Sequence, residues 1–290
     1  MLLGSIDSGG RRLTCAVADE HQQIIKKALY LTTDPAATFK HIVAFFSPYQ
    51  EELAALGVAS FGPIDIDPQS PTFGYITTTP KVGWKNVNFV GELKKHFNLP
   101  IYWTTGVNAS VYGEYLNLKD QLHHGSLVYF TLGTGVGAGA IQNGNFIGGV
   151  GAPEMGHVFV KRHPDDRTFT GICPYHGDCL EGLVGGPTFQ ARLGIRGEDV
   201  DDTDHVWDIL AYYVAQASIQ ATTILRPEKI IFGGSVARPQ LIKKVREQFE
   251  RMFNHYMEVG EIEDYIIHPS VPRNESATRG NFALAAELLK

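Results

Sequence analysis

The chain has 290 residues, 43% of them hydrophobic, and its 31 acidic and 25 basic residues give a formal net charge of -6. This length suits two ordinary α/β domains and excludes a single small module. The acidic excess gives no electrostatic reason to expect nucleic acid or an anionic membrane as the main partner. No charged N-terminal segment precedes a long apolar stretch, and no run of about 18 apolar residues occurs. We therefore expect an unexported, cytoplasmic protein.

The first half of the chain predicts a short meander followed by helices and strands. Residues 2–18 form two apolar stretches around a double-glycine turn, and residues 23–31 add a third strand with less regular alternation. Asp34 and Pro35 supply an N-cap with proline at the first helical position, so a helix is expected to begin here. The later elements expected in this half are strands at 56–60 and 101–103 and an amphipathic helix at 107–118.

The same order of elements returns in the second half, which indicates a duplicated architecture. The expected elements are strands at 127–132, 138–141, 145–147 and 229–232 and helices near 206–225 and 238–257. We therefore predict an α/β protein of two domains with a cleft between them. The first domain covers residues 1–120 and is completed by the C-terminal helix 277–290, and the second covers residues 121–276.

Glycine-rich turns at equivalent strand ends predict a nucleotide site. Such turns let backbone N–H groups approach phosphate oxygens closely. One turn alone suits a plain hairpin equally well, whereas two facing turns suit a polyphosphate, and a third suits the base or ribose. The residues expected at these turns are Asp7, Gly9, Gly10, Gly133, Thr134, Gly135, Gly233, Gly234 and Ser235. Because Asp7 ends a buried strand, we expect its carboxylate on the magnesium or phosphate side of the nucleotide.

Four residues, His157, Cys173, His176 and Cys179, have the types and the CxxHxxC spacing of a tetrahedral zinc site. The alternative is a pair of buried free cysteines with surface histidines. The loop at 171–177 contains proline and glycine and has little regular structure to hold it otherwise. Because four protein ligands leave no open position for a water molecule, we expect structural Zn²⁺, in a reducing compartment that keeps the thiols free.

Two glutamates flank the predicted metal loop. Glu154 lies three residues before His157, and Glu181 lies two residues after Cys179. A loop held by a metal would fix both carboxylates where they accept hydrogen bonds from neighbouring hydroxyl groups of a sugar. Each glutamate alone would also suit a solvated loop charge, so this prediction depends on the metal site.

Together these motifs resemble the ROK family of sugar kinases and regulators, and within it the bacterial fructokinases. The resemblance spans nearly the whole chain. The segments that carry it are Gly4–Gly10, Phe61–Pro63, Tyr75–Trp84, Val107–Ala109, Leu132–Gly137, Glu154–His157 and Cys173–Gly182. The Thr-Pro-Lys-x-Gly-Trp segment at 79–84 and the Cys-Pro-x-His-x-x-Cys-Leu-Glu-Gly loop at 173–182 are similar to the fructokinase branch in particular.

The resemblance implies an actin-like, ribonuclease H-like fold that binds ATP with Mg²⁺ and transfers the γ-phosphoryl group to a hexose, with D-fructose as the first expectation. It implies a sugar site and a structural zinc that share His157. The implied sugar ligands are Asn108, Glu154, His157 and Glu181. The positions that match the ATP site of the family are Gly133, Thr134, Gly186, Pro187, Gly233 and Gly234. The resemblance also favours a homodimer.

The sequence departs from the family pattern at the general base and at two turns on the ATP side. In ROK kinases the residue two before the motif's asparagine is the aspartate that takes the proton from the sugar hydroxyl, and here it is Gly106. General-base assistance is typically worth about 10²–10⁴ in rate, so a kinase without it should be slow. Thr104 and Thr105 are poor substitutes, because a hydroxyl stays protonated near neutral pH. Arg11 follows the first double glycine in place of threonine, and it is a candidate nucleotide residue that either binds a phosphate bidentately or fills the space that the phosphates need. Ser235 replaces the third glycine of the adenosine turn.

The sequence is compatible with three functions. The leading one is a fructokinase-like sugar kinase whose activity is reduced by the missing base. The rival is a catalytically inactive pseudokinase that binds a sugar as a sensor or regulator, and Gly106 and the altered turns motivate it. A DNA-binding ROK repressor is disfavoured, because such repressors carry a winged helix-turn-helix ahead of this fold, and the fold is expected from residue 1. Spacing alone fixes neither the hexose nor the oligomeric state.

Overall fold

The computed structural model describes residues 1–290, and its internal contacts divide the chain into two compact units. Unit 1 contains residues 1–117, 148–152 and 271–290, and unit 2 contains residues 118–147 and 153–270. The first division follows Asn117, near the expected boundary at residue 120. The C-terminal segment joins unit 1 from Val271, before the expected helix.

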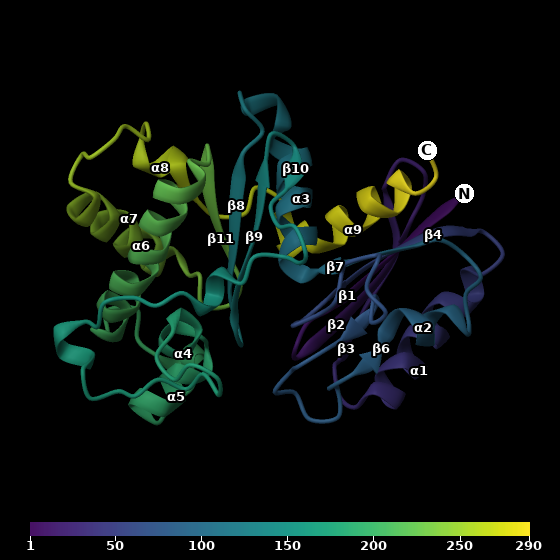
Figure 1. Cartoon of the computed structure of the whole chain (residues 1–290), viewed down its shortest axis with the longest axis horizontal. Coiled ribbons are helices and arrows are strands. Elements are labelled where there is room, and N and C mark those ends of the chain that lie inside the picture. Colours follow the sequence, from purple (N-terminus) through teal and green to yellow (C-terminus); the bar gives the residue numbers. More distant parts are fainter. The chain divides into compact units, whose positions relative to one another are not determined.

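The centre of unit 1 is a five-stranded mixed sheet (Figure 1). Its order is β3 (Ile24–Leu31), β2 (Arg12–Ala18), β1 (Leu2–Ser8), β4 (Leu53–Ser60) and β7 (Ile101–Thr105). The first three strands are antiparallel, and β1, β4 and β7 are parallel. The predicted meander and the two later strands are confirmed, with β4 beginning at Leu53.

Helices cover both faces of this sheet. The helices of unit 1 are α1 (Pro35–Phe46), α2 (Phe89–Lys94), α3 (Gly106–Leu118) and α9 (Ser276–Glu287). A hairpin of β5 (Tyr75–Ile76) and β6 (Val87–Asn88) completes the unit. Phe46 of α1 packs on the face that carries Ile6, and Phe282 of α9 packs with Leu3 on the opposite face. Since side chains alternate along a strand, Asp7 points to the same side as Leu3.

The helices α3 and α9 cross at a distance that only glycine permits. A Cβ on Gly113 would lie 2.1 Å from the carbonyl oxygen of Ser276, and a Cβ on Gly280 would lie 1.9 Å from that of Ala109. The hydroxyl group of Ser276 also donates to the buried carboxylate of Glu114 at 2.6 Å. The C-terminal segment therefore fixes α3 against the sheet, which in turn positions the first turn of α3.

Unit 2 repeats the sheet of unit 1. Its order is β10 (Asn145–Phe146), β9 (Val136–Gln142), β8 (Leu127–Leu132), β11 (Lys229–Gly233) and β12 (Ile266–Ile267). Again the first three strands are antiparallel and the last three are parallel. In each sheet a glycine-rich turn joins the first strand in sequence to the second. The predicted duplication is thus confirmed at the level of strand order.

The helices of unit 2 are α4 (Leu180–Val184), α5 (Pro187–Leu193), α6 (Val206–Leu225), α7 (Pro239–Phe253) and α8 (Ile262–Tyr265). Single 3₁₀ turns of the chain lie at 47–49, 119–121, 155–157, 164–166, 197–199 and 272–274. The predicted helices α6 and α7 are confirmed. However, α7 ends at Phe253 and not at residue 257, because Asn254 and His255 adopt left-handed backbone angles.

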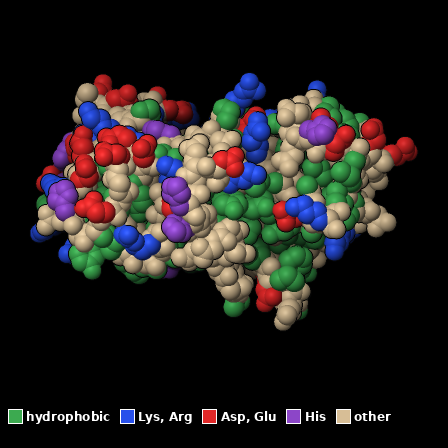
Figure 2. Space-filling model, turned by 90° about the horizontal axis from the view of Figure 1, so that it is seen from above, with side chains coloured by type: hydrophobic (Ala, Val, Ile, Leu, Met, Phe, Trp, Pro, Cys, Tyr) green, Lys and Arg blue, Asp and Glu red, His purple; other side chains and the backbone are tan.

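The surface carries charges of both signs. On the face seen in Figure 2, lysine and arginine side chains are interspersed with acidic ones and do not gather in one basic patch. This distribution agrees with the net charge of -6. None of the helices is both long and apolar enough to cross a membrane.

Replacement of Gly113 by alanine should destabilise unit 1. The new methyl group would meet backbone atoms of α9, which move only if the two helices separate, and overpacking of this kind typically costs about 1–3 kcal/mol. We expect a lower urea midpoint than for the wild type. Gly149→Ala is the matched control, because nothing lies within 4 Å of its Cβ position. Equal midpoints for the two variants would contradict this packing.

Candidate functional site

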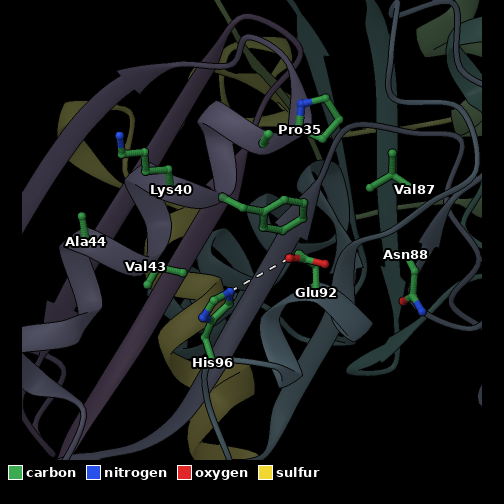
Figure 3. Close-up of a pocket in the computed structure, with 10 residues that line it drawn as sticks. Pro35, Lys40, Val43, Ala44, Val87, Asn88, Glu92 and His96 are labelled. Carbon is green, nitrogen blue, oxygen red and sulfur yellow. Dashed lines mark ion pairs between the residues drawn. The ribbon is translucent and has the colours of Figure 1, made fainter.

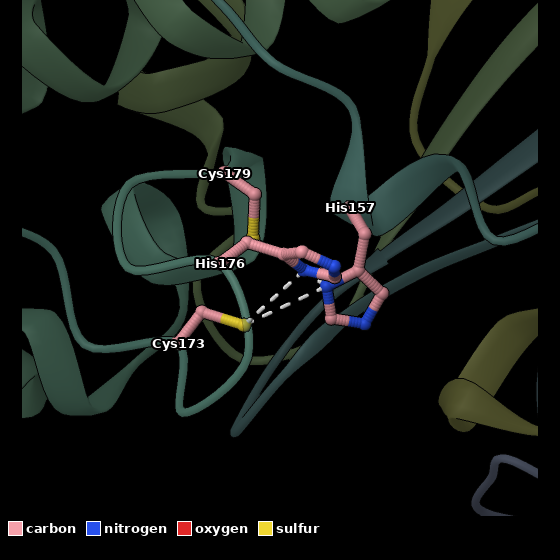
Figure 4. Close-up of side chains that lie close together, drawn as sticks. All are labelled: His157, Cys173, His176 and Cys179. Atoms are coloured by element: carbon pink, nitrogen blue, oxygen red, sulfur yellow. Dashed lines mark hydrogen bonds between the residues drawn. The ribbon is translucent and has the colours of Figure 1, made fainter.

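Four side chains of unit 2 converge on one point: His157, Cys173, His176 and Cys179 (Figure 4). Their ligand atoms all lie within 4.8 Å of one another. Nδ1 of His157 is 3.4 Å from Sγ of Cys179 and 3.7 Å from Sγ of Cys173. Nδ1 of His176 is 3.7 Å from Sγ of Cys173. The sequence separates His157 from the other three, and the fold brings it to them.

The three separations of 3.4–3.7 Å match the edges of a zinc coordination tetrahedron, and the others reach at most 4.8 Å. With Zn–S near about 2.3 Å and Zn–N near about 2.0–2.1 Å, ligand atoms are about 3.3–3.8 Å apart. No disulfide competes, since all three cysteines are free. Burial raises the pKa of the Cys179 thiol to about 11, and Cys173 adds to the rise. A bound cation would reverse that effect, so the chemistry of these four residues fits Zn²⁺.

The backbone fixes the two segments of this cluster to each other. Gly156 lies against β9 so closely that a Cβ would be 1.8 Å from the carbonyl oxygen of Val136. The N–H group of Leu180 donates to the carbonyl of Val158 at 2.9 Å. The segment with His157 is therefore held both to β9 and to the loop that carries the other three ligands.

Hydrogen bonds of Arg162 also hold the metal loop. Nη1 of Arg162 donates to Oδ2 of Asp178 at 3.1 Å, and its Nη2 donates to the carbonyl groups of Asp166 and Phe169. Asp166 is buried and accepts hydrogen bonds of 3.0 and 2.8 Å from Arg192. This network links the loop to the rest of unit 2 independently of any ion.

The two glutamates predicted to bind sugar lie beside the cluster. Oε2 of Glu181 accepts from the N–H group of Val136 at 3.0 Å, and a Cβ on Gly135 would lie 2.5 Å from that oxygen. Desolvation by surrounding atoms raises the pKa of Glu154, His157 opposes this, and Glu181 adds to the rise. The contact of Glu181 with the glycine-rich turn was not indicated by the sequence. It joins the metal loop directly to that turn.

The nucleotide residues predicted in unit 2 gather at the carboxyl ends of β8 and β11. The N–H group of Gly186 donates to the carbonyl of Gly133 at 2.7 Å. Gly234 has φ of +96°, and a Cβ there would lie 2.4 Å from the carbonyl oxygen of Leu132. The residues at this edge are Gly133, Thr134, Gly135, Gly186, Pro187, Gly233, Gly234 and Ser235. Three segments that are distant in sequence therefore form one edge.

The first glycine turn, in unit 1, is held by a lysine that sequence reasoning missed. Nζ of Lys81 donates to the carbonyl groups of Gly10 at 2.8 Å and Thr32 at 3.0 Å. Burial lowers the pKa of Lys81. Lys81 belongs to the Thr-Pro-Lys segment that carries the family resemblance, and this motif was the only signal for it. The side chain of Arg11, in the same turn, is exposed.

Asp7 lies beside Gly106. A Cβ on Gly106 would be 3.8 Å from Oδ1 of Asp7, the only atom within 4 Å apart from the two chain neighbours and the backbone of α3. Burial raises the pKa of Asp7 to about 6, and Lys27 opposes this. The hydroxyl of Thr105 caps α3 by accepting from the N–H group of Asn108 at 3.1 Å. Oδ1 of Asn108 is buried and has no hydrogen-bond partner.

A groove of about 740 Å³ lies on the α1 side of unit 1 (Figure 3). Phe39, Val87 and a Glu92–His96 ion pair of 4.0 Å line it. None of the predicted site residues lines this groove, and Asp7 points to the opposite face of the sheet.

Comparison with known proteins matches residues 3–288 to the model of the ROK family. The chain belongs to the ROK family. The fructokinase of Streptococcus mutans is 51% identical over 99% of this chain and 98% of that protein. The fructokinase of Lactococcus lactis is 52% identical over 98% of this chain and 97% of that protein. The resemblance inferred from the motifs is confirmed, including its fructokinase branch.

A solved ROK family glucokinase from Streptomyces griseus, in complex with glucose and AMPPNP, has the same fold. It superimposes with a TM-score of 0.76 and covers 99% of this chain and 100% of its own, at 21% identity. The predicted actin-like α/β fold is therefore confirmed for this ROK protein. Gly106 lies inside the matched region.

Removal of zinc should loosen the metal loop without unfolding unit 2, because the Arg162 network remains. We expect Cys173→Ala to abolish metal binding, to lower the melting temperature and to weaken fructose binding roughly tenfold or more. Elemental analysis, thermal melting and calorimetry measure the three effects. Cys15→Ala is the control, since Cys15 lies in the core of unit 1 and should leave the metal content unchanged. Unaltered sugar affinity in a metal-free Cys173→Ala protein would refute the prediction.

Lys81→Met should raise the KM for ATP. The substitution keeps the alkyl stem but removes the ammonium group that fixes two carbonyl groups of the glycine turn, and hydrogen bonds from charged groups contribute about 1.5–3 kcal/mol. We expect an increase of roughly tenfold or more in initial-rate measurements. Lys85→Met is the matched control, because Lys85 is exposed. The same KM in both variants would argue against a role of Lys81 at the turn.

Proposed function

We propose that this ROK protein is a fructokinase, which transfers the γ-phosphoryl group of ATP to a hydroxyl group of D-fructose. The observation that carries the proposal is the identity of 51% and 52% with two fructokinases over nearly their whole length. The residues expected to bind the sugar, Asn108, Glu154, His157 and Glu181, are all present.

In this proposal the nucleotide binds at the edge formed by β8 and β11. Backbone N–H groups of the turn at 133–135 face the phosphates, and the turn at 233–235 receives the ribose or base. Mg²⁺ bound with the nucleotide supplies positive charge to the phosphoryl oxygens. Donors that are fixed before the reaction stabilise the charge that develops on those oxygens at little reorganisation cost.

The sugar is recognised by carboxylates that the metal loop positions. Glu154 and Glu181 accept hydrogen bonds from its hydroxyl groups, and His157 contributes to both the sugar and the metal site. The four residues of the cluster would hold a structural Zn²⁺, whose ligand set leaves no open position for catalysis. The hydrogen bond between Glu181 and Val136 supports this role, because it fixes the sugar carboxylate to the phosphate turn.

A second candidate function follows from Gly106. A protein with intact sugar residues and no base beside the hydroxyl would bind hexose without turnover, as a pseudokinase that senses or sequesters it. Thr105 does not replace the base, because a hydroxyl stays protonated near neutral pH, and its oxygen already accepts the N–H group of Asn108. The two functions differ in turnover and share the binding of sugar.

We further propose that the protein is a homodimer in the cytoplasm, where the thiols of the cluster stay reduced. Light scattering should give twice the chain mass of 31.9 kDa. A monomeric mass would refute the dimer and leave the kinase assignment intact.

The decisive measurement is a coupled assay with fructose and Mg-ATP. We expect slow but saturable turnover by the wild type, and at least a tenfold increase for Gly106→Asp, because general-base assistance contributes about 10²–10⁴ in rate. Gly106→Ala is the matched control, since its methyl group fits at 3.8 Å from Asp7 and brings no proton acceptor. Sugar binding by calorimetry without turnover in the wild type would establish the pseudokinase instead. Absence of fructose and ATP binding would refute both.

A further inference from the structure

The turn at 233–235 of unit 2, which is expected to receive the ribose or base, leads into α7. The N–H group of Val236 donates to the carbonyl of Leu132 at 2.8 Å, so the segment after the turn begins against β8. Arg238 is the N-cap residue of α7, and Pro239 is the first residue of the helix. The N–H group of Arg238 donates to the carbonyl of Val236 at 2.7 Å. The start of α7 and the turn therefore share one short, hydrogen-bonded segment.

The guanidinium group of Arg238 makes three contacts, all with residues 197–207. Nη2 donates to the carbonyl of Gly197 at 2.8 Å, and Nη1 donates to Oδ1 of Asp202 at 3.3 Å. Cζ lies 5.2 Å from the centre of the Trp207 ring, within the range of a cation–π contact. The side chain of Asp202 is 67% exposed, and exposed ion pairs contribute little. The contacts with Gly197 and Trp207 should therefore carry most of the effect of Arg238.

Gly197 and Trp207 both pack on Phe189 of α5. A Cβ on Gly197 would lie 2.7 Å from the buried ring of Phe189, so the ring would have to move to make room for a side chain there. The ring centres of Trp207 and Phe189 are 5.0 Å apart, and both side chains are buried. Through this layer of packed side chains, Arg238 joins the start of α7 to α5.

The two helices joined in this way both begin at the expected nucleotide edge. α5 starts directly after Gly186, whose N–H group donates to the carbonyl of Gly133 at 2.7 Å. A Cβ on Gly186 would lie 3.7 Å from Cγ2 of Val236, which places the two chain segments side by side. The position of Gly186 relative to the turn at 233–235 therefore depends on how α5 and α7 are held to each other, and Arg238 provides that connection.

We propose that Arg238 is a positioning residue of the nucleotide site. It sets the separation between the turn at 233–235 and the segment at 186–187, and through that separation the affinity for an adenine nucleotide. None of its three contacts lies at the turn itself, so it acts through other residues. This inference rests on the proposed function, which puts the nucleotide at this edge. A site that is already held in its binding geometry loses less conformational freedom when the ligand binds, and this raises affinity.

Calorimetry tests the assignment without requiring turnover. The wild type, Arg238→Met, Arg238→Lys and Arg251→Met are titrated with Mg²⁺ and AMPPNP, an ATP analogue, and separately with fructose. We expect Arg238→Met to weaken AMPPNP binding roughly tenfold, because it keeps the alkyl stem and removes both donors. Arg238→Lys should lie between the wild type and Arg238→Met, because lysine keeps the charge and a donor but lacks the planar group over Trp207.

Arg251→Met is the matched control. Arg251 lies on the same helix, is exposed and donates only to Gln248 of α7. Its AMPPNP affinity should stay within about twofold of the wild type. The fructose affinity of all three variants should also stay within about twofold, because the assignment concerns the nucleotide alone. Urea unfolding curves show that each variant is folded under the titration conditions, and Arg238→Lys decides by the same criteria if Arg238→Met does not fold.

Other outcomes overturn the assignment. If Arg238→Met binds AMPPNP as tightly as the wild type, Arg238 does not set the nucleotide site. If its affinities for AMPPNP and fructose fall together, Arg238 contributes to general stability and not to positioning. If Arg238→Lys binds AMPPNP no better than a folded Arg238→Met, the donors are not the cause. If the wild type itself binds no AMPPNP, the proposed function fails, and the assignment fails with it.

Discussion

The hydrogen bond from the N–H group of Val136 to Glu181 is the interaction on which the arrangement of unit 2 depends. Val136 begins β9 directly after the glycine-rich turn, and Glu181 is the second residue of α4, just after the loop that carries Cys173, His176 and Cys179. Gly156 brings the segment of His157 against the same residue of β9. The cluster of His157 and its three neighbours, Glu181 and the glycine-rich turn at 133–135 are therefore directly connected, so a change in one of them reaches the others through very few bonds.

The two units differ in how their glycine turns are held. In unit 2 the turn is held by two hydrogen bonds, one from the N–H group of Val136 to Glu181 and one from the N–H group of Gly186 to the carbonyl of Gly133. In unit 1 the turn is held by the hydrogen bond from Lys81 to the carbonyl of Gly10 and by the pairing of β2 with β3. The side chain of Arg11 is exposed, so the turn is held without it.

Much of the fold follows from local sequence, and the failures have physical causes. Apolar alternation and the double glycine predicted β1 and β2, and the cap at Asp34, which accepts from the N–H group of Ala37 at 2.9 Å, predicted α1. The short helices α4 and α5 gave no periodic signal, because five and seven residues are too few for one. Their positions are set by tertiary contacts: α4 packs against α6, and Phe189 of α5 packs against Trp207 of α6.

The sequence predicts those parts of the candidate site that consist of rare residue types in a characteristic spacing. Two cysteines and two histidines in one spacing point to a metal without knowledge of the fold. Lys81 carried no such signal, since a lysine in a loop is common and only its contact with Gly10 shows its position. The location of Asp7 beside Gly106 was equally inaccessible, because it depends on how α3 is fixed by the C-terminal helix.

The side chain at position 106 has little effect on the stability of α3. Glycine inside a helix costs roughly 0.5–1 kcal/mol relative to alanine, but Gly106 is the first residue of α3, where the backbone N–H group has no helical partner in any case. The cap from Thr105 satisfies the N–H group of Asn108 whichever side chain stands at 106. The side chain at position 106 can therefore differ without disturbing the start of α3 or the position of Asn108.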